Sequence, residues 1–390
     1  MFKQKEILEK KILIKKRDIL RYQGIFLGRP IIGPRQLHLH ITNVCDRKCI
    51  FCWYNSPLVS KKESPRHIDF EVLKRLILDC KDMNIETINL EGGEITLHPE
   101  MKKVFLLIKS LRFRLITYSH LAFNKKHLDY LRFADLINVN LSASNKKSYE
   151  AIHGDNKFQQ VIRNLYSLDA IKKKDGKPKI ILSFIITELN YKEIEKFISL
   201  AQKLHADRLK FKLHKATKEL QQLVLTKSSF TRLRKMLSCL LKKDLKIKNN
   251  LMQIFNIIKD DNFLKNRFYL NRTNRHNDRY FYYYAFPGNR INCFIGWFYA
   301  LIDEMGRVIA PCDNVGVCIA GNINKESFKS IWYRSHKFQK IRTESMNEID
   351  IREKKWHECR YCSNVDLNKK MLSMIKTINP TFFLKNIANK

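Results

Sequence analysis

The sequence has few acidic residues for its length. Its 38 Asp and Glu residues stand against 74 Lys and Arg residues, so the formal net charge is +36. A field of that sign attracts nucleic acid, anionic lipid or phosphorylated small molecules. The lysines are spread along the whole chain, however, as in a genome with biased composition. Both interpretations of the charge stay open at the level of sequence.

Long apolar runs are also missing. No run reaches the roughly 20 residues that a membrane-spanning helix needs. The N-terminal stretch MFKQKEILEKKILIKKRDIL has the pattern of a basic amphipathic helix. It lacks the apolar core and the small-residue cleavage site of a secretory signal. We therefore expect a cytoplasmic protein without a transmembrane segment.

Short β-rich runs alternate with longer helical runs between residue 37 and about residue 216. The predicted strands cover residues 37–42, 87–93, 114–120, 136–143, 179–187 and 208–215. The predicted helices between them cover residues 70–83, 99–111, 125–134, 158–174 and 191–204, each with apolar residues at a spacing of three or four. This alternation predicts an α/β fold with a parallel sheet, a partial (β/α)6 TIM-like barrel whose functional residues lie at the carboxyl ends of the strands.

The rest of the chain is predicted to form four further segments, one of which is a small second domain. The stretch FYALIDEMGRVIAPC reads as a β-hairpin, and residues 327–342 read as a helix. An aromatic-rich stretch at residues 262–290 reads as a bridge before this domain. The predicted organisation is a basic N-terminal extension (1–36), the barrel (37–216), a helical and aromatic bridge (217–290), a small cysteine-containing domain (291–366) and a basic helical tail (367–390).

Ten cysteines in a chain of this kind favour metal binding over a disulfide framework. Eight of them form two groups, at residues 45–52 and 293–362. Cys80 and Cys239 stand alone in helical patterns, and each is predicted to be a small buried apolar residue.

Cys45, Cys49 and Cys52 follow the first predicted strand with the spacing C-x3-C-x2-C. Thiolates bind soft metals and iron–sulfur clusters. A structural zinc site takes four ligands, so three thiolates leave one position for something else to bind. On spacing alone, a zinc loop remains an alternative.

Together these features resemble the radical S-adenosylmethionine (SAM) superfamily. Phe51 precedes the third cysteine, and Gly92, Gly93 and Glu94 end the second strand, as in the family pattern. The usual proline after the glutamate is Ile95 here. The resemblance implies a [4Fe–4S] cluster on the three cysteines, with SAM bound at the open iron. It implies that the two glycines and Glu94 contact the methionine part of SAM, and that Phe51 packs on its adenine. It assigns further SAM contacts to three residues after the fourth and fifth strands: Ser142, Ser144 and Asn190.

The later cysteines resemble the auxiliary-cluster extension called SPASM or, when shortened, twitch. The hairpin, the GNI before a helix containing Trp332, and the final C-x2-C carry this resemblance. It implies one auxiliary [4Fe–4S] cluster on four ligands: Cys293, Cys312, Cys359 and Cys362. Cys318 is then spare. From local spacing alone, a four-thiolate zinc site fits about equally well.

The family chemistry is reductive cleavage of SAM to a 5′-deoxyadenosyl radical, which abstracts a hydrogen atom from a substrate. An auxiliary cluster favours net oxidation or bond formation on a small molecule or peptide. The resemblance implies an electron donor such as flavodoxin or ferredoxin. Two alternatives remain. One is radical modification of an anionic macromolecule such as RNA or a lipid headgroup. The other is a non-enzymatic metal-dependent protein that binds nucleic acid through its basic helices and the aromatic residues 280–286.

Overall fold

The computed structural model describes residues 16–60, 63–214, 218–259, 290–310, 312, 318–347, 349–350, 359 and 365–378. Its centre is a sheet with six parallel strands in sequential order. They are β1 (Gln36–His40), β2 (Thr87–Glu91), β3 (Arg114–Ser119), β4 (Leu136–Asn140), β5 (Lys179–Ile186) and β6 (Arg208–Leu213). The six strands predicted from sequence are confirmed.

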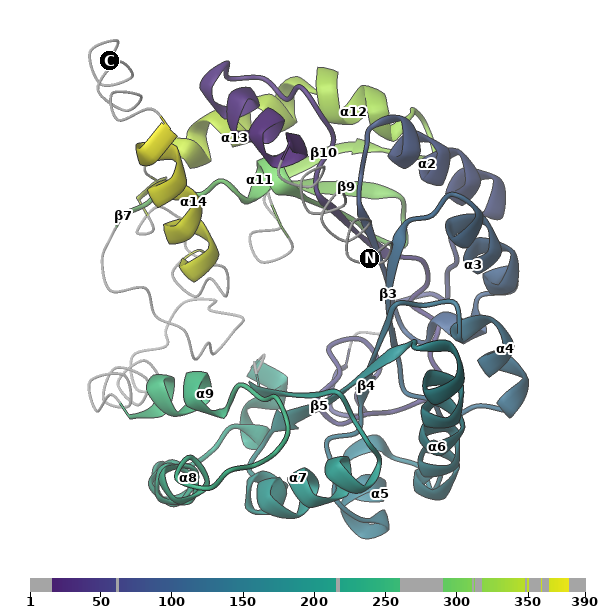
Figure 1. Ribbon diagram of the computed structural model, residues 1–390, viewed down its shortest axis with the longest axis vertical. Coiled ribbons are helices and arrows are strands. Elements are labelled where there is room, and N and C mark those ends of the chain that lie inside the picture. Colours follow the sequence, from purple (N-terminus) through teal and green to yellow (C-terminus); the bar gives the residue numbers. More distant parts are fainter. Residues whose placement is uncertain are drawn as a thin grey trace, which may run out of the picture.

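Helices connect consecutive strands and lie along the convex side of the curved sheet (Figure 1). They are α2 (Phe70–Asp82), α3 (Met101–Ser110), α4 (Leu128–Leu131), α5 (Lys146–His153), α6 (Phe158–Asp175) and α7 (Ile194–Lys203). Asp69 starts α2 by accepting hydrogen bonds from the Glu71 and Val72 amides, which satisfies two donors that the first turn leaves open. The sequence did not predict α5.

The two faces of the sheet differ in chemistry. Side chains alternate between faces along a strand. In β1, Leu37 and Leu39 are fully buried toward the helices, whereas His38 and His40 are on the concave face and partly exposed. Strands of a closed parallel barrel are usually apolar on both faces. The polar concave face therefore indicates a surface that meets a ligand or water.

The predicted C-terminal hairpin exists, but its sheet is not separate from the barrel. It comprises β8 (Tyr299–Ile302) and β9 (Arg307–Ala310), and β10 (Cys318–Asn322) adds a further antiparallel strand. β8 pairs in parallel with β1, so the nine-stranded order is β10-β9-β8-β1-β2-β3-β4-β5-β6. The cysteine-containing segment is thus built onto the β1 edge of the barrel.

The single helix predicted for residues 327–342 is two helices, α12 (Phe328–Arg334) and α13 (His336–Met346). The break lies at Ser335, whose side chain accepts from the Phe338 amide and caps α13. A second apolar core joins α13 to the N-terminal helix at residues 16–26, to α11 (Ile295–Phe298) and to α14 (Val365–Ile378). Its members are Ile25, Phe294, Trp297, Phe298, Met346, Met371 and Ile375. The short strands β7 (Arg290–Ile291) and β11 (Ile349–Asp350) form a separate antiparallel pair.

The bridge is helical in α8 (Lys227–Leu240) and α9 (Leu251–Ile258), as predicted. Short 3-10 turns complete the elements, at Ile95–Leu97, Lys125–His127, Tyr191–Glu193 and Lys218–Leu223. The aromatic stretch predicted as the rest of the bridge, the first fifteen residues and the end of the tail lie outside the described residues. Within the described ranges, no helix combines the length and apolar character needed to cross a membrane.

The prediction for the two isolated cysteines was half right. Cys80 is fully buried in α2, as expected. Cys239 is exposed on α8, because it lies on the helix face opposite the buried Phe230, Leu233 and Leu237. Helical periodicity therefore places it at the surface.

Candidate active site

The three cysteines of the first group line one cavity at the carboxyl end of the sheet. Cys45, Cys49 and Cys52 lie in the loop after β1. Gly92 and Gly93, directly after β2, line the same cavity. The sequence predicted that the cysteine loop and the two glycines lie together, since the carboxyl ends of parallel strands share one edge of a sheet.

Gly92 and Gly93 fix the position of the cysteine loop. The Gly93 amide donates to Thr42 O at 2.8 Å, and the Glu94 amide donates to Val44 O at 2.8 Å. A Cβ on Gly92 would lie 2.2 Å from Thr42 O, and one on Gly93 would lie 2.2 Å from Val44 O. Gly92 also has φ +152°, a conformation that favours glycine. The two glycines are thus required for close backbone contact between the β2 end and the cysteine loop.

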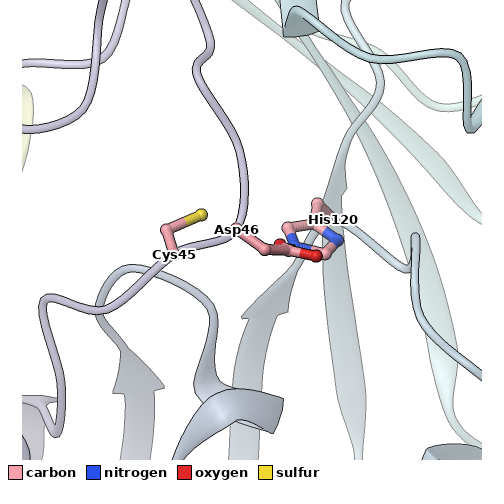
Figure 2. Close-up of side chains that lie close together, drawn as sticks. All are labelled: Cys45, Asp46 and His120. Carbon is pink, nitrogen blue, oxygen red and sulfur yellow. The ribbon is translucent and has the colours of Figure 1, made fainter.

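An Asp46–His120 pair ties the loop to the end of β3 (Figure 2). His120 Nδ1 accepts from the Ala122 amide at 2.9 Å, so Nε2 carries the proton and donates to Asp46 Oδ1 at 2.8 Å. This hydrogen bond, with further support from Lys157, holds the pKa of Asp46 well below its ordinary value. Cys45 Sγ, Asp46 and His120 offer ligand atoms within 4.8 Å of one another. The loop is therefore held from one side by a neutral histidine and an ionised carboxylate.

The unpredicted helix α5 holds the loop from the other side. Arg47 is buried, and its guanidinium hydrogen-bonds Tyr149 Oη and lies 3.3 Å from Asp155. His153 Nε2 donates to Leu141 O at 2.8 Å, which leaves Nδ1 to accept from the Cys49 thiol at 3.1 Å. Burial, followed by the charge of Arg47, lowers the pKa of His153 to about 3. α5 thereby orients one of the three cysteines directly.

The donor set fits an iron–sulfur cluster. Three thiols from one short loop face one cavity, and thiolates are the ligands that such clusters require. Burial raises the pKa of the Cys45 thiol to about 12 and raises that of Cys49 as well. These thiols are protonated until a metal displaces the protons, so cluster assembly must release protons.

Glu94 is buried, with 1% of its side chain exposed, and forms a hydrogen-bonded hub. Its oxygens accept from the Thr96 amide and hydroxyl and from the His120 amide. Ser119 Oγ lies 2.9 Å from one carboxylate oxygen and 3.1 Å from the other, but it has a single proton to donate. These four donors match the four acceptor sites of a carboxylate, so a cationic ligand group in the cavity would share an oxygen that is already hydrogen-bonded.

The structure does not bring Ser142, Ser144 and Asn190 into the lining of the cavity. Ser142 Oγ accepts from the Ile185 amide, and Asn190 Nδ2 donates to Ser142 O and Ile185 O. Ser144 Oγ donates to Glu193 at 2.8 Å. These side chains stabilise the backbone around the ends of β4 and β5. Three other polar residues of β4 and β5 line the cavity instead: Asn138, Asn140 and Ser183.

Phe51 does line the cavity, and its ring packs edge-to-face on His153 at 5.8 Å. The other polar groups of the site were not predicted from the sequence. They are Asn43, Asp46, Arg47, Tyr54, Asn55, Glu91, Tyr118, Ser119, His120, Asn138, Asn140, His153, Ser183 and Lys212. The two-residue period of β4 and β5 was the available signal for Asn138, Asn140 and Ser183, since it places them on the concave face.

In the second cysteine group, Cys293, Cys312 and Cys359 are buried and Cys318 is partly buried. Asn368 of α14 donates to Cys293 Sγ at 3.8 Å, and the Ser345 hydroxyl donates to Cys293 O at 3.1 Å. Cys318 pairs in register with Ala310, so it lies at the same end of the hairpin as Cys312. The predicted fourth ligand, Cys362, lies outside the described residues.

Two family models match the chain. The radical SAM superfamily matches residues 39–201, and the iron–sulfur cluster-binding SPASM domain matches residues 293–363. These domains imply [4Fe–4S] clusters and SAM as the cofactors of the chain.

Curated relatives match less than half of the chain. The chain is 28% identical over 186 residues to the "Probable GTP 3',8-cyclase" of Saccharolobus islandicus strain L.S.2.15, covering 47% of this chain and 56% of the relative. It is 23% identical over 166 residues to the GTP 3',8-cyclase of Vibrio vulnificus, covering 42% of this chain and 49% of the relative. The chain thus spans about half the length of these curated relatives.

Solved structures share the fold across both domains. Streptococcus suis SuiB bound to SAM gives a TM-score of 0.58 at 14% identity, covering 86% of this chain and 74% of that protein. The protein anSMEcpe with bound SAM gives a TM-score of 0.57 at 15% identity, covering 86% and 85%. With the three-cysteine cavity and the two matching domains, the chain belongs to the radical SAM superfamily and carries a C-terminal SPASM domain.

Proposed function

We propose that the protein reductively cleaves SAM and uses the resulting radical to abstract a hydrogen atom from a substrate. The observation that carries this proposal is the cavity shared by Cys45, Cys49, Cys52 and the Gly92–Gly93 turn. Three thiols without a fourth leave one iron for SAM to chelate. When bound, the cluster and SAM supply an electron and a 5′-deoxyadenosyl radical.

The residues of the chain bind and orient in this scheme. Cys45, Cys49 and Cys52 hold the cluster, while Gly92 and Gly93 bring the backbone close to the methionine part of SAM. Glu94 lines the same cavity and accepts a charge-assisted hydrogen bond from the SAM ammonium group, which shares a carboxylate oxygen with donors of the protein. Asn138, Asn140 and Ser183 are the polar groups placed for the adenosine, in place of Ser142, Ser144 and Asn190. Phe51 contributes an apolar wall.

We infer that Cys293, Cys312, Cys359 and Cys362 would hold an auxiliary [4Fe–4S] cluster, which would supply an electron acceptor for the substrate radical when bound. Such an acceptor favours net oxidation or bond formation on a small molecule or peptide. SuiB has also been solved bound to its precursor peptide SuiA, which supports a peptide as the substrate. The electron needed to start the reaction would come from a donor such as flavodoxin or ferredoxin, in a cytoplasmic setting.

A second candidate substrate class is anionic. It is supported by the net charge of +36 and by curated relatives whose names include GTP. Nucleotides, RNA and lipid headgroups share this chemistry. Binding to RNA that weakens steeply with salt would favour the macromolecular version.

The auxiliary cluster yields a sharp test of the proposal. The Cys312→Ala/Cys359→Ala variant is expected to lose about four of about eight irons, one [4Fe–4S] cluster of two. It should still form 5′-deoxyadenosine in the presence of SAM and a strong reductant, because the barrel alone builds the first site. Iron analysis and chromatography of the products measure both effects. Cys239→Ala, a change at an exposed cysteine, is the control and should keep all its iron.

Two outcomes would contradict the assignment. A double variant that retains about eight irons would remove these cysteines from a cluster. A wild-type protein that holds zinc at this site would replace the redox role with a structural one. Circular dichroism of the variant shows whether the fold has survived the loss of the ligands.

A further inference from the structure

The concave face of β6 carries a row of three cations. In the sequence RLKFKL, the side chains of Leu209, Phe211 and Leu213 are buried toward the helices. The two-residue period of a strand therefore places Arg208, Lys210 and Lys212 on the opposite, concave face. Consecutive members of this row are about 7 Å apart along the strand.

This cation row leads away from the cysteine loop. Lys212 lines the same cavity as Cys45, Cys49 and Cys52. Lys210 and Arg208 line an adjoining cavity, together with Lys248. Tyr118 and Asn138 line both cavities, so the two are parts of one continuous hollow on the concave face. A molecule in this hollow would touch the cluster site at one end and the cation row along its length.

No carboxylate neutralises this row among the residues that the structure describes. Lys172 on α6 shows the usual arrangement, because it lies 3.1 Å from Asp207 and 3.4 Å from Asp169. The acid whose field reaches β6 is Glu91, and its carboxylate is already 2.5 Å from His38 Nδ1. Burial favours the neutral form of Glu91, but the hydrogen bond and charge of His38, with the charges of His40 and Lys212, together keep its pKa below the ordinary value.

Holding these cations together has an electrostatic cost. Burial, followed by the charge of Lys212, lowers the pKa of Lys210 to about 8. Like charges in a partly buried site destabilise the fold unless an anion compensates them. An oxyanion with several lone pairs would accept hydrogen bonds from both ammonium groups and the guanidinium.

We propose that the substrate carries an oxyanion, a phosphate or a carboxylate, that binds Lys210 and Lys212 with Arg208 and leaves its reacting carbon toward the cysteine loop. This inference rests on the proposed function, because only the radical chemistry makes the bound molecule a substrate. The orientation of the substrate follows from the order of the cations along β6, because Lys212 lies nearest the cluster cavity and Arg208 lies farthest from it. The inward-facing row favours a small anion over an extended polyanion on the outer surface.

Labelling by pyridoxal 5′-phosphate tests the site without needing the true substrate. This probe combines a phosphate with an aldehyde that forms a Schiff base with an unprotonated lysine. Full-length protein reconstituted without oxygen is treated with the probe and cyanoborohydride, and labelled peptides are mapped by mass spectrometry. Lys210 and Lys212 are expected to react ahead of Lys196 and Lys203, two exposed lysines on α7. Labelling in proportion to exposure would overturn the inference.

Competition identifies the source of the oxyanion. Pyrophosphate should slow labelling at Lys210 and Lys212 but not at Lys196 and Lys203 if the site takes a phosphate. Succinate should do so if it takes a carboxylate. If neither anion protects the β6 lysines at millimolar concentration, the site is not an oxyanion site.

Calorimetry with variants provides the second measurement. The Lys210→Met/Lys212→Met variant should bind the protecting anion about tenfold to hundredfold more weakly, and Lys196→Met/Lys203→Met should bind it like the wild type. Iron content and circular dichroism check that both variants are intact. A protein that cleaves SAM but binds neither anion would refute only this inference. One that binds the anion at β6 but never cleaves SAM would refute the proposed function.

Discussion

Replacing Cys45, Cys49 and Cys52 together with alanine is expected to abolish 5′-deoxyadenosine formation. These thiols are the donors that face the cavity beside the Gly92–Gly93 turn. Without them the first cluster has no ligands, so SAM has no iron to chelate. Bound iron should fall from about eight to about four atoms, because the auxiliary site is built from other cysteines. Anaerobic iron and sulfide analysis, with chromatography of SAM products, measures both.

The matched control for this triple variant is Cys239→Ala, which removes an exposed thiol on α8. It should keep its iron and its turnover. Turnover in the triple variant equal to that of the wild type would assign the activity to a contaminant. Retention of all the iron would mean that the first loop holds no cluster.

Gly93→Ala is expected to reduce SAM cleavage by about a hundredfold or more while leaving the protein folded. The added Cβ would lie 2.2 Å from Val44 O and 2.8 Å from Asn43 O, so the cysteine loop must move by about an ångström. A displacement of that size at a reacting centre typically costs about a hundredfold in rate. The strands β1 and β2 pair over five residue positions before this turn, so the sheet itself should survive. The rate of 5′-deoxyadenosine formation measures the loss of activity, and a thermal melt shows whether the protein is still folded.

Gly176→Ala is the control for Gly93→Ala, because it adds backbone strain without a steric contact. Gly176 ends α6 at φ +73°, and a Cβ there would meet no atom within 4 Å. The variant should lose roughly 1–2 kcal/mol of stability from the left-handed conformation but keep its turnover. If Gly93→Ala loses no more activity than Gly176→Ala, close backbone contact at Gly93 does not position the cluster loop.

The barrel strands and the cysteine loop could be predicted because local signals specify them. Each strand has its own apolar pattern, and Cys45, Cys49 and Cys52 lie within eight residues of one another. The Gly92–Gly93 turn could also be placed at the same edge, because it directly follows the next strand. The hairpin was predictable from Gly306 at its turn, which has φ +75°.

The contacts that hold the loop could not be predicted, because they join segments far apart in sequence. Arg47 meets Tyr149, Cys49 meets His153, and Asp46 meets His120. The helix α5 that provides two of these partners has only eight residues, too few for its apolar period to stand out. The pairing of β8 with β1 is likewise invisible in local patterns.

The predicted SAM contacts of Ser142, Ser144 and Asn190 show a different limit of prediction from sequence. All three follow strands, as ligand-binding residues of such folds do. Ser142 adopts φ +44°, however, and its hydroxyl bonds to Asn140 of β4 and to the Ile185 amide of β5. The sequence marks a polar residue near a strand end, but backbone conformation decides where its side chain lies.

The most direct test of the account is whether SAM binds an iron of the cluster on Cys45, Cys49 and Cys52. The reduced protein would be mixed with SAM carrying ¹⁵N in its amino group and studied by electron–nuclear double resonance. A ¹⁵N coupling to the reduced cluster in the wild type, absent from the triple-alanine variant, is the result that the three-thiol site predicts. A reduced cluster that shows no such coupling while equilibrium dialysis finds SAM bound would contradict it.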